Sequence, residues 1–295
     1  MTDFHGVFPY LVSPTDTSGR IRTDVLGRLS DDLIKAGVHG LTPLGSTGEF
    51  AYLNAGQRTA VVQATIEAAN KRVPVIAGTG SNSTREAIDL TKHAERAGAS
   101  GALVVNPYYN KPTQEGLYRH FRAVAESVTI PIVTYNIAGR TAVNVETATM
   151  ARLARDCANI VGVKEASGSL DQMSQVIAAC GPSFSVLSGD DNITLPLMAI
   201  GGHGVISVIA NIVPRETADL VHAALDGDFK RARELHYRLF PLARAAFLET
   251  NPIPIKEAMA MAGMLEPEFR LPMCRMGDAN RETLRGILRQ YALVK

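Results

Sequence analysis

The stretch Ile160-Val161-Gly162-Val163-Lys164-Glu165-Ala166 joins a short β-branched run to a lysine at its end. Such a run is typical of a strand buried inside a sheet, which would carry Lys164 to the strand end with its aliphatic stem enclosed. Burial disfavours the ammonium and lowers the pKa of a lysine, and the neutral amine is the form that attacks a carbonyl. A surface lysine that merely ends a strand is the alternative, and this stretch alone does not separate the two.

The pattern of a short apolar run followed by a longer amphipathic segment repeats along the whole chain. Eight runs predict strands: Val7–Val12, Gly40–Leu44, Val73–Ala77, Ala102–Val105, Ile130–Tyr135, Ile160–Lys164, Phe184–Leu187 and Val205–Val208. Eight segments predict helices: Asp24–Ala36, Ala55–Asn70, Thr84–Ala97, Gln114–Ser127, Glu146–Ala154, Leu170–Ala178, Ile193–Ala199 and Pro214–Leu225. Eight such units in about 225 residues match an α/β fold, the (β/α)8 or TIM barrel. A doubly wound open sheet is the alternative, but the Gly-rich turn expected after its first strand is absent.

The segment after the eighth unit predicts three further helices, Asp228–Phe247, Ile255–Met261 and Asn280–Ala292. The Pro-rich sequence Asn251-Pro252-Ile253-Pro254 separates the first two of them. No low-complexity linker interrupts the chain. We therefore expect a barrel over residues 1–226 and a C-terminal three-helix extension over residues 227–295.

Composition excludes several classes of partner. The chain has 295 residues and a formal net charge of +1 from 30 basic and 29 acidic residues, which gives no support for a nucleic-acid partner. No stretch approaches the roughly 20 apolar residues of a membrane helix, and no secretory signal is recognisable. Its three cysteines lack the spacing of disulfide or metal motifs, as expected in a reducing compartment. We expect a cytoplasmic protein without membrane contact.

Motifs for metal and nucleotide chemistry are also missing from the sequence. The seven histidines show no ligand spacing, and Gly78-Thr79-Gly80 lacks the third glycine of a dinucleotide-binding turn. Neither a Walker loop nor a Gly-x-Ser-x-Gly elbow is found. We therefore expect no metal and no cofactor. A site of this kind built around a lysine indicates Schiff-base chemistry.

Polar residues follow several predicted strands, at the end of the barrel where active sites lie. They are Gly45-Ser46-Thr47-Gly48-Glu49, Asn106-Pro107-Tyr108-Tyr109, Tyr135-Asn136 with the later Arg140, Lys164, and Ser188-Gly189-Asp190-Asp191. The backbone amides and hydroxyls of 45–48 could hold a carboxylate, although an ordinary turn would have the same composition. Tyr135 could relay protons or be a packed aromatic, and Arg140 could bind a carboxylate or extend into solvent.

These motifs together resemble the dihydrodipicolinate synthase family, within the pyruvate-dependent class I aldolase and N-acetylneuraminate lyase superfamily. The resemblance rests on 45–49, 135–141, 162–166, 188–191, 201–208, 251–256 and 271–273, and so spans almost the whole chain. It implies a Schiff-base lyase that condenses pyruvate with L-aspartate β-semialdehyde to 4-hydroxy-tetrahydrodipicolinate, in lysine and diaminopimelate biosynthesis. The alternative within the superfamily is an aldolase or dehydratase acting on a 2-keto-3-deoxy sugar acid or another 2-oxo acid.

The resemblance also implies a role for each site residue. Lys164 would form the imine with pyruvate, and Tyr135 would shuttle protons, linked to Thr47 and to Tyr109 of a neighbouring subunit. The backbone amides of Ser46 and Thr47 would hold the pyruvate carboxylate, and Arg140 would bind the carboxylate of the aldehyde. Gly189 and the backbone of Ile206 would line the pocket. A homotetramer built as a dimer of dimers is expected, with Tyr108, Tyr109 and the C-terminal helices near interfaces.

Several residues depart from the synthase pattern. Ser46, Ala138, Ala142 and Tyr10 replace the threonine, proline, glycine and small residue that are usual, which leaves the aldehyde partner less determined than the imine chemistry. Asn82, Glu86 and Tyr108 match the site for feedback by lysine, whereas Phe50, Ala55 and Arg58 do not, so we expect weak or absent inhibition. A catalytically silent pyruvate- or amino-acid-binding regulator is the alternative outside enzymes, and the joint presence of Lys164, Tyr135, Thr47 and Arg140 disfavours it.

Overall fold

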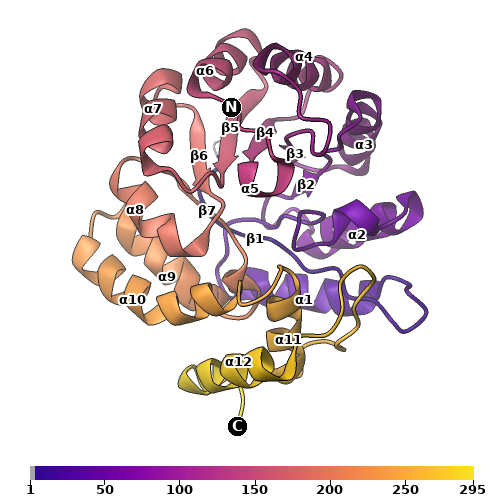
Figure 1. Ribbon diagram of the computed structural model, residues 1–295, viewed down its shortest axis with the longest axis vertical. Helices are drawn as coiled ribbons and strands as arrows, with labels where there is room; N and C mark the ends of the chain where they lie inside the picture. The colour runs from indigo at the N-terminus through magenta and orange to yellow at the C-terminus, as the bar shows by residue number, and fades with distance from the viewer. Residues whose placement is uncertain (1–3) are drawn as a thin grey trace.

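The computed structural model describes residues 4–295 of the chain. At its centre lies a sheet of seven parallel strands, which helices surround on the outside (Figure 1). The strands follow the order β1-β7-β6-β5-β4-β3-β2, so that β7 returns to pair with β1. Their bounds are β1 Gly6–Pro9, β2 Ile76–Gly78, β3 Gly101–Val105, β4 Ile132–Asn136, β5 Ile160–Glu165, β6 Ser185–Ser188 and β7 Gly204–Ser207.

The gap between β1 and β2 is closed by the segment 39–43, where a strand over Gly40–Leu44 was predicted. Leu41 forms a parallel bridge with Val75, and Thr42 forms one with Tyr10. The amide of Ile76 donates to the carbonyl of Leu41, and the amide of Leu11 donates to that of Thr42. These bonds close the sheet into a barrel, so the predicted α/β fold class is confirmed. The segment is too short and irregular to count as a strand.

The helices alternate with the strands and then continue past the barrel. They are α1 Thr23–Lys35, α2 Ala55–Ala69, α3 Thr84–Ala97, α4 Gln114–Ala125, α5 Ala138–Thr141, α6 Thr147–Asp156, α7 Leu170–Cys180, α8 Thr194–Ala199, α9 Pro214–Leu225, α10 Phe229–Ala245, α11 Ile253–Met261 and α12 Asp278–Gln290. The 3₁₀ turns η2 Asp191–Ile193 and η3 Ile209–Asn211 follow β6 and β7, and η1 Phe50–Tyr52 follows the loop after the segment 39–43. In the part of the chain that the structure describes, no helix is long and apolar enough to cross a membrane.

The three C-terminal helices α10, α11 and α12 pack against the barrel. Leu235 of α10, Ile255 of α11 and Leu284 of α12 belong to one buried hydrophobic cluster that also contains Leu26 of α1 and Val205 of β7. Burial of these apolar side chains is the main force that holds the extension in place. The predicted boundary between residues 226 and 227 stays a prediction.

The inside of the barrel is filled by a separate cluster of inward-facing side chains. Phe8 and Tyr10 enter it from the first strand, Tyr135 from β4, Leu187 from β6 and Ile206 from β7. Alternation along each strand places every second residue in this interior. The last inward residues of neighbouring strands therefore meet at one end of the barrel, where the candidate site lies.

Candidate active site

Lys164 lies near the carboxyl end of β5, in register with Tyr135 on β4 and Leu187 on β6. Its side chain is buried, with a residual exposure of 1%. Burial lowers the pKa of Lys164 well below 10.5, and the nearby carboxylates of Asp190 and Asp191 oppose this shift only in part. The neutral, nucleophilic amine is thus accessible at a pH where an exposed lysine would be charged.

Two aromatic rings enclose the amine of Lys164. Its Nζ lies 3.4 Å from the ring centroid of Tyr10 and 4.3 Å from that of Tyr135. The two rings meet edge to face, with centroids 6.1 Å apart and planes at 80°. Burial raises the pKa of both phenols, an effect that hydrogen bonding with Ser46 partly offsets. Both phenols therefore stay protonated at neutral pH and can donate as well as accept a proton.

The loop Gly45–Glu49 brings Ser46 and Thr47 to this end of the barrel. Ser46 lies close enough to Tyr10 and Tyr135 to lower the pKa of both phenols. The hydroxyl of Thr47 accepts a hydrogen bond of 2.9 Å from Nδ2 of Asn251 instead. The predicted link between Tyr135 and Thr47 stays a prediction.

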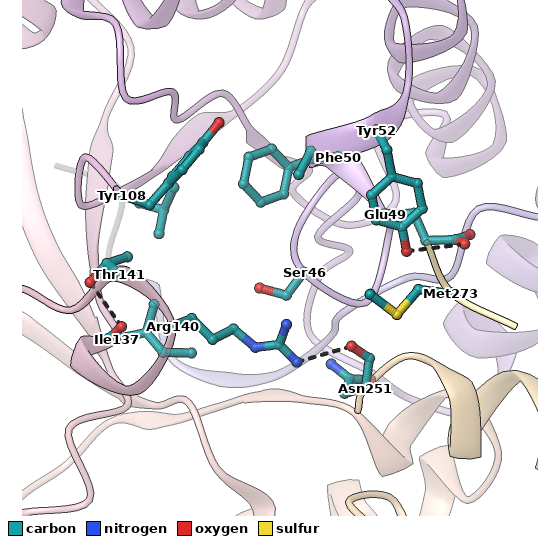
Figure 2. A pocket seen from close by; sticks show the side chains of 12 residues that line it. Ser46, Glu49, Phe50, Tyr52, Tyr108, Ile137, Arg140, Thr141, Asn251 and Met273 are labelled. Carbon is teal, nitrogen blue, oxygen red and sulfur yellow. Dashed lines mark hydrogen bonds between the residues drawn. The ribbon is translucent and has the colours of Figure 1, made fainter. Parts of the chain in front are cut away.

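A cavity of about 190 Å³ opens beside this loop (Figure 2). Ser46, Phe50, Tyr108, Ile137, Arg140, Asn251 and Met273 are among the residues that line it. The guanidinium of Arg140 extends into the cavity from α5, and its Nη2 donates to the backbone carbonyl of Asn251 over 2.9 Å (Figure 2). A cation at the edge of a concave, largely apolar space is suited to bind a carboxylate.

Asn251 was quoted only as part of a motif and was not predicted as a site residue. Its carbonyl and side-chain amide hold Arg140 and Thr47, so this single residue of the C-terminal extension fixes two predicted site residues. The signal available in the sequence was an asparagine directly before a proline. Once such a residue is buried, its backbone and side-chain polar groups both need hydrogen-bond partners.

Two buried carboxylates that were not predicted as site residues fix the strand ends around Lys164. Glu165 accepts hydrogen bonds of 3.0 Å from Nδ2 of Asn136 and from the amide of Ser167. Asp191 accepts bonds from the Ser207 hydroxyl and from the amides of Val208 and Ile209. Such bonds orient the ends of β5 and β7 without contacting the amine. In the sequence, the only signal for this role is that both acids follow the end of a predicted strand.

The remaining predicted residues differ in their distance from the amine. Gly189 donates its amide to the carbonyl of Glu165, next to Lys164, and a Cβ there would lie 2.5 Å from that of Ala166. Ile206 is fully buried inside the barrel, in register with Phe8. Tyr109 is 90% exposed and does not line the cavity, whereas its neighbour Tyr108 does.

Within residues 4–295, no three His, Cys, Asp or Glu side chains are grouped so that they could hold a metal ion.

Comparison with known proteins places these features in a family. Residues 3–291 match the model of the dihydrodipicolinate synthetase family. The 4-hydroxy-tetrahydrodipicolinate synthase of Syntrophus aciditrophicus is 52% identical over 291 residues, which cover 99% of both chains. The solved dihydrodipicolinate synthase of Aquifex aeolicus is 48% identical and superimposes with a TM-score of 0.97 over 98% of this chain and 99% of that one. A structure described as the first monomeric dihydrodipicolinate synthase variant is 41% identical, with a TM-score of 0.96 over 99% and 98% of the two chains.

Proposed function

The chain belongs to the dihydrodipicolinate synthetase family, and on this premise we propose that it condenses pyruvate with L-aspartate β-semialdehyde to 4-hydroxy-tetrahydrodipicolinate, a step of lysine biosynthesis. It is a class I lyase, in which a lysine forms a Schiff base with the substrate. The observation that carries this function is the buried Lys164 with a lowered pKa, enclosed by two phenols at the carboxyl end of a barrel strand.

In the first half of the proposed reaction, the Lys164 amine adds to the C2 carbonyl of pyruvate and water leaves. The backbone amides of Ser46 and Thr47 hold the pyruvate carboxylate, as successive N–H groups in a tight loop can do. The iminium withdraws electrons from the C3 methyl group, so that loss of a C3 proton gives an enamine. Tyr135 moves this proton; its register with Lys164 and the 4.3 Å between Nζ and its ring centroid support this role.

In the second half, the enamine carbon attacks the aldehyde carbon of the semialdehyde, and the new alkoxide takes up a proton. Arg140 binds the carboxylate of this substrate, which its place in the cavity supports. The amino group of the bound substrate then adds to the iminium carbon, and the Lys164 amine departs as the ring closes. Holding both substrates between Lys164 and Arg140 makes the carbon–carbon step effectively unimolecular.

A homotetramer arranged as a dimer of dimers is the proposed assembly, with Tyr109 acting on the site of a neighbouring subunit. Tyr109 supports this: it is 90% exposed and has a φ of 73°, a left-handed conformation that is unfavourable for a bulky residue unless contacts hold it. Further large apolar side chains are exposed on helices or in the turns that directly follow them, namely Leu170, Ile200, Leu225, Phe229, Tyr237, Phe240, Phe247 and Leu248. Exposed apolar surface of this kind favours burial against another protein chain.

We also propose a cytoplasmic location. Its support is that Cys157, Cys180 and Cys274 are all unpaired, as thiols are in a reducing compartment.

The function is tested by two measurements on the same preparations. Borohydride reduction with pyruvate should add covalent mass to Lys164, and turnover with L-aspartate β-semialdehyde should reach a kcat/KM above roughly 10⁴ M⁻¹s⁻¹. Lys164→Ala should lose both signals, whereas Lys92→Ala, at an exposed position of α3, should keep both. Trapping without turnover would reject the semialdehyde as the partner and direct the search to 2-keto-3-deoxy acids. No trapping at all would reject the Schiff base and favour a silent regulator.

A further inference from the structure

Tyr10 occupies the space that a 2-oxo acid must reach. Its ring face contacts the Lys164 amine, with 3.4 Å between Nζ and the ring centroid, so no substrate atom fits between them. The side chain is 2% exposed and lies within the aromatic cluster of the barrel interior. The residues that line the open cavity include Ser46 but not Lys164.

The other end of the Tyr10 side chain lies against the loop that is proposed to hold the carboxylate. A Cβ placed on Gly45 would lie 1.5 Å from two ring carbons of Tyr10, which means that the ring rests on the α-carbon of Gly45. The Tyr10 hydroxyl would lie 2.0 Å from the same Cβ, so the polar end of the ring also rests against the loop next to Ser46. The phenol oxygen therefore lies close to the loop whose amides would bind a carboxylate oxygen.

Tyr10 thus spans from the nucleophile to the anion-binding amides. A 2-oxo acid bound as an imine spans the same two points, with C2 on Nζ and its carboxylate at the amides. Part of the ring must yield for any donor to enter, and a ring held by Lys164, Gly45 and Tyr135 can yield only a little.

We propose that Tyr10 determines donor selectivity, because its ring can yield enough space beside Lys164 for pyruvate, the smallest 2-oxo acid with a C3 carbon, and excludes acids with a longer chain at C3. This inference deepens the proposed function, since it rests on imine formation at Lys164. It requires nothing of the second substrate.

The test measures imine formation alone, so that it stays independent of the aldehyde. The amine adds to the C2 carbonyl, water leaves, and borohydride supplies the hydride that reduces the iminium to a stable secondary amine. Initial rates of trapping are compared for pyruvate and 2-oxobutanoate, which differ by one methylene group. The variants are Tyr10→Phe, Tyr10→Leu and Tyr10→Ala, and the matched control is Phe8→Leu, a buried ring two residues earlier on the same strand face.

The expected result is a rate ratio of 2-oxobutanoate to pyruvate that rises as side chain 10 shrinks. The ratio should stay near the wild-type value in Tyr10→Phe and increase at least about 10-fold in Tyr10→Ala, the discrimination that one methylene group commonly carries. Tyr10→Leu should fall between them and Phe8→Leu should leave the ratio unchanged. Because the ratio comes from folded, reactive molecules only, partial unfolding of one variant does not alter it.

A pyruvate adduct whose ratio is the same in all Tyr10 variants would overturn the inference and leave the proposed function standing. An equal rise in Phe8→Leu would overturn it too, since general loosening of the barrel would then explain the change. No adduct with either acid on any variant would overturn the Schiff base and this inference together.

Discussion

Replacing Lys256 by methionine is expected to destabilise the fold by about 3–5 kcal/mol, the usual cost of leaving one partner of a buried ion pair without its counter-charge. Nζ of Lys256 lies 3.0 Å from Oε2 of Glu49, and the two side chains are 1% and 0% exposed. The ammonium also donates to the backbone carbonyl of Glu268. This pair ties the loop that carries Ser46 to helix α11 of the C-terminal extension.

The structure supports a magnitude in this range. Two unit charges 3.0 Å apart attract by roughly 5 kcal/mol at an effective dielectric constant of 20. Removing the ammonium leaves the carboxylate of Glu49 buried without this attraction. In the double variant Lys256→Met with Glu49→Gln, neither position of this pair carries a buried charge. Its cost should be smaller than that of Lys256→Met alone, so that the coupling energy reaches about 2 kcal/mol or more.

Urea denaturation of the wild type, both single variants and the double variant measures this cycle at one fixed protein concentration. Arg231→Met provides the control, because Arg231 and Glu234 lie at a similar distance, 3.2 Å, but are more than half exposed. That exposed pair should contribute no more than about 1 kcal/mol. Additive costs for Lys256 and Glu49, or a loss at Lys256 no larger than at Arg231, would refute the reasoning.

Three further predictions concern charge. Burial lowers the pKa of His39 and His120 to about 4, so both are neutral in the folded protein above that pH and take up protons on unfolding below about pH 6.5. The free energy of unfolding should therefore decrease as the pH is lowered from about 6.5 to 4. Denaturation series at several pH values should show a smaller decrease for His120→Gln. Nη1 of Arg58 lies 3.3 Å from the carboxylate of Glu86, which a bound lysine ammonium would need as its partner. Millimolar L-lysine should therefore not slow turnover, and a micromolar inhibition constant would contradict this. Arg140→Gln should raise KM for the semialdehyde at least about 10-fold, because the carboxylate of this substrate loses its charged partner. The rate of borohydride trapping with pyruvate should stay constant. An equal loss of trapping would place Arg140 at the pyruvate site instead.

The barrel was predictable because its signal is repeated. Apolar runs and helical segments alternate along the chain, so a strand predicted one or two residues too long or too short does not change the number of strand–helix units. The segment Gly40–Leu44 shows the limit of this signal. Pro43 has no amide hydrogen to donate, and Leu44 adopts a φ of 61°, so backbone geometry ends the ladder where side-chain pattern alone predicts a strand.

The site was predictable where chemistry and strand ends coincide, as at Lys164 and Tyr135. Contacts between distant segments were not: Asn251 reaches Thr47 across 204 positions of the sequence. The choice between two adjacent hydroxyls, Ser46 and Thr47, also depends on which way the loop turns. Neighbouring residues of a loop point in different directions, and composition does not encode which one faces the phenol.

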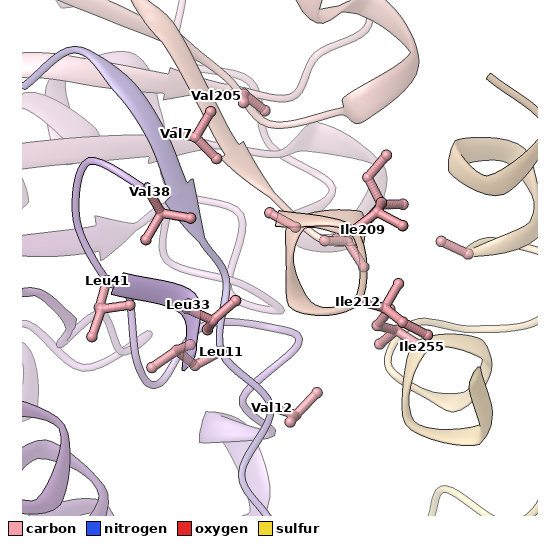
Figure 3. Close-up of a cluster of buried hydrophobic side chains, with 14 of the residues drawn as sticks. Val7, Leu11, Val12, Leu33, Val38, Leu41, Val205, Ile209, Ile212 and Ile255 are labelled. Atoms are coloured by element: carbon pink, nitrogen blue, oxygen red, sulfur yellow. The ribbon is translucent and has the colours of Figure 1, made fainter. Parts of the chain in front are cut away.

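The closure of the barrel through residues 39–43 has a consequence for its dynamics. Two isolated bridges link this segment to the residues next to β1 and β2, whereas continuous ladders join the other neighbouring strands. Besides its backbone hydrogen bonds, Leu41 belongs to the same buried hydrophobic cluster as Val7 and Val38 (Figure 3). Local opening should therefore begin at this junction, and the amide of Ile76 should exchange with solvent faster than those within β4 and β5. Because the loop Gly45–Glu49 continues from this segment, a ligand that binds the closed form would slow that exchange in proportion to its occupancy.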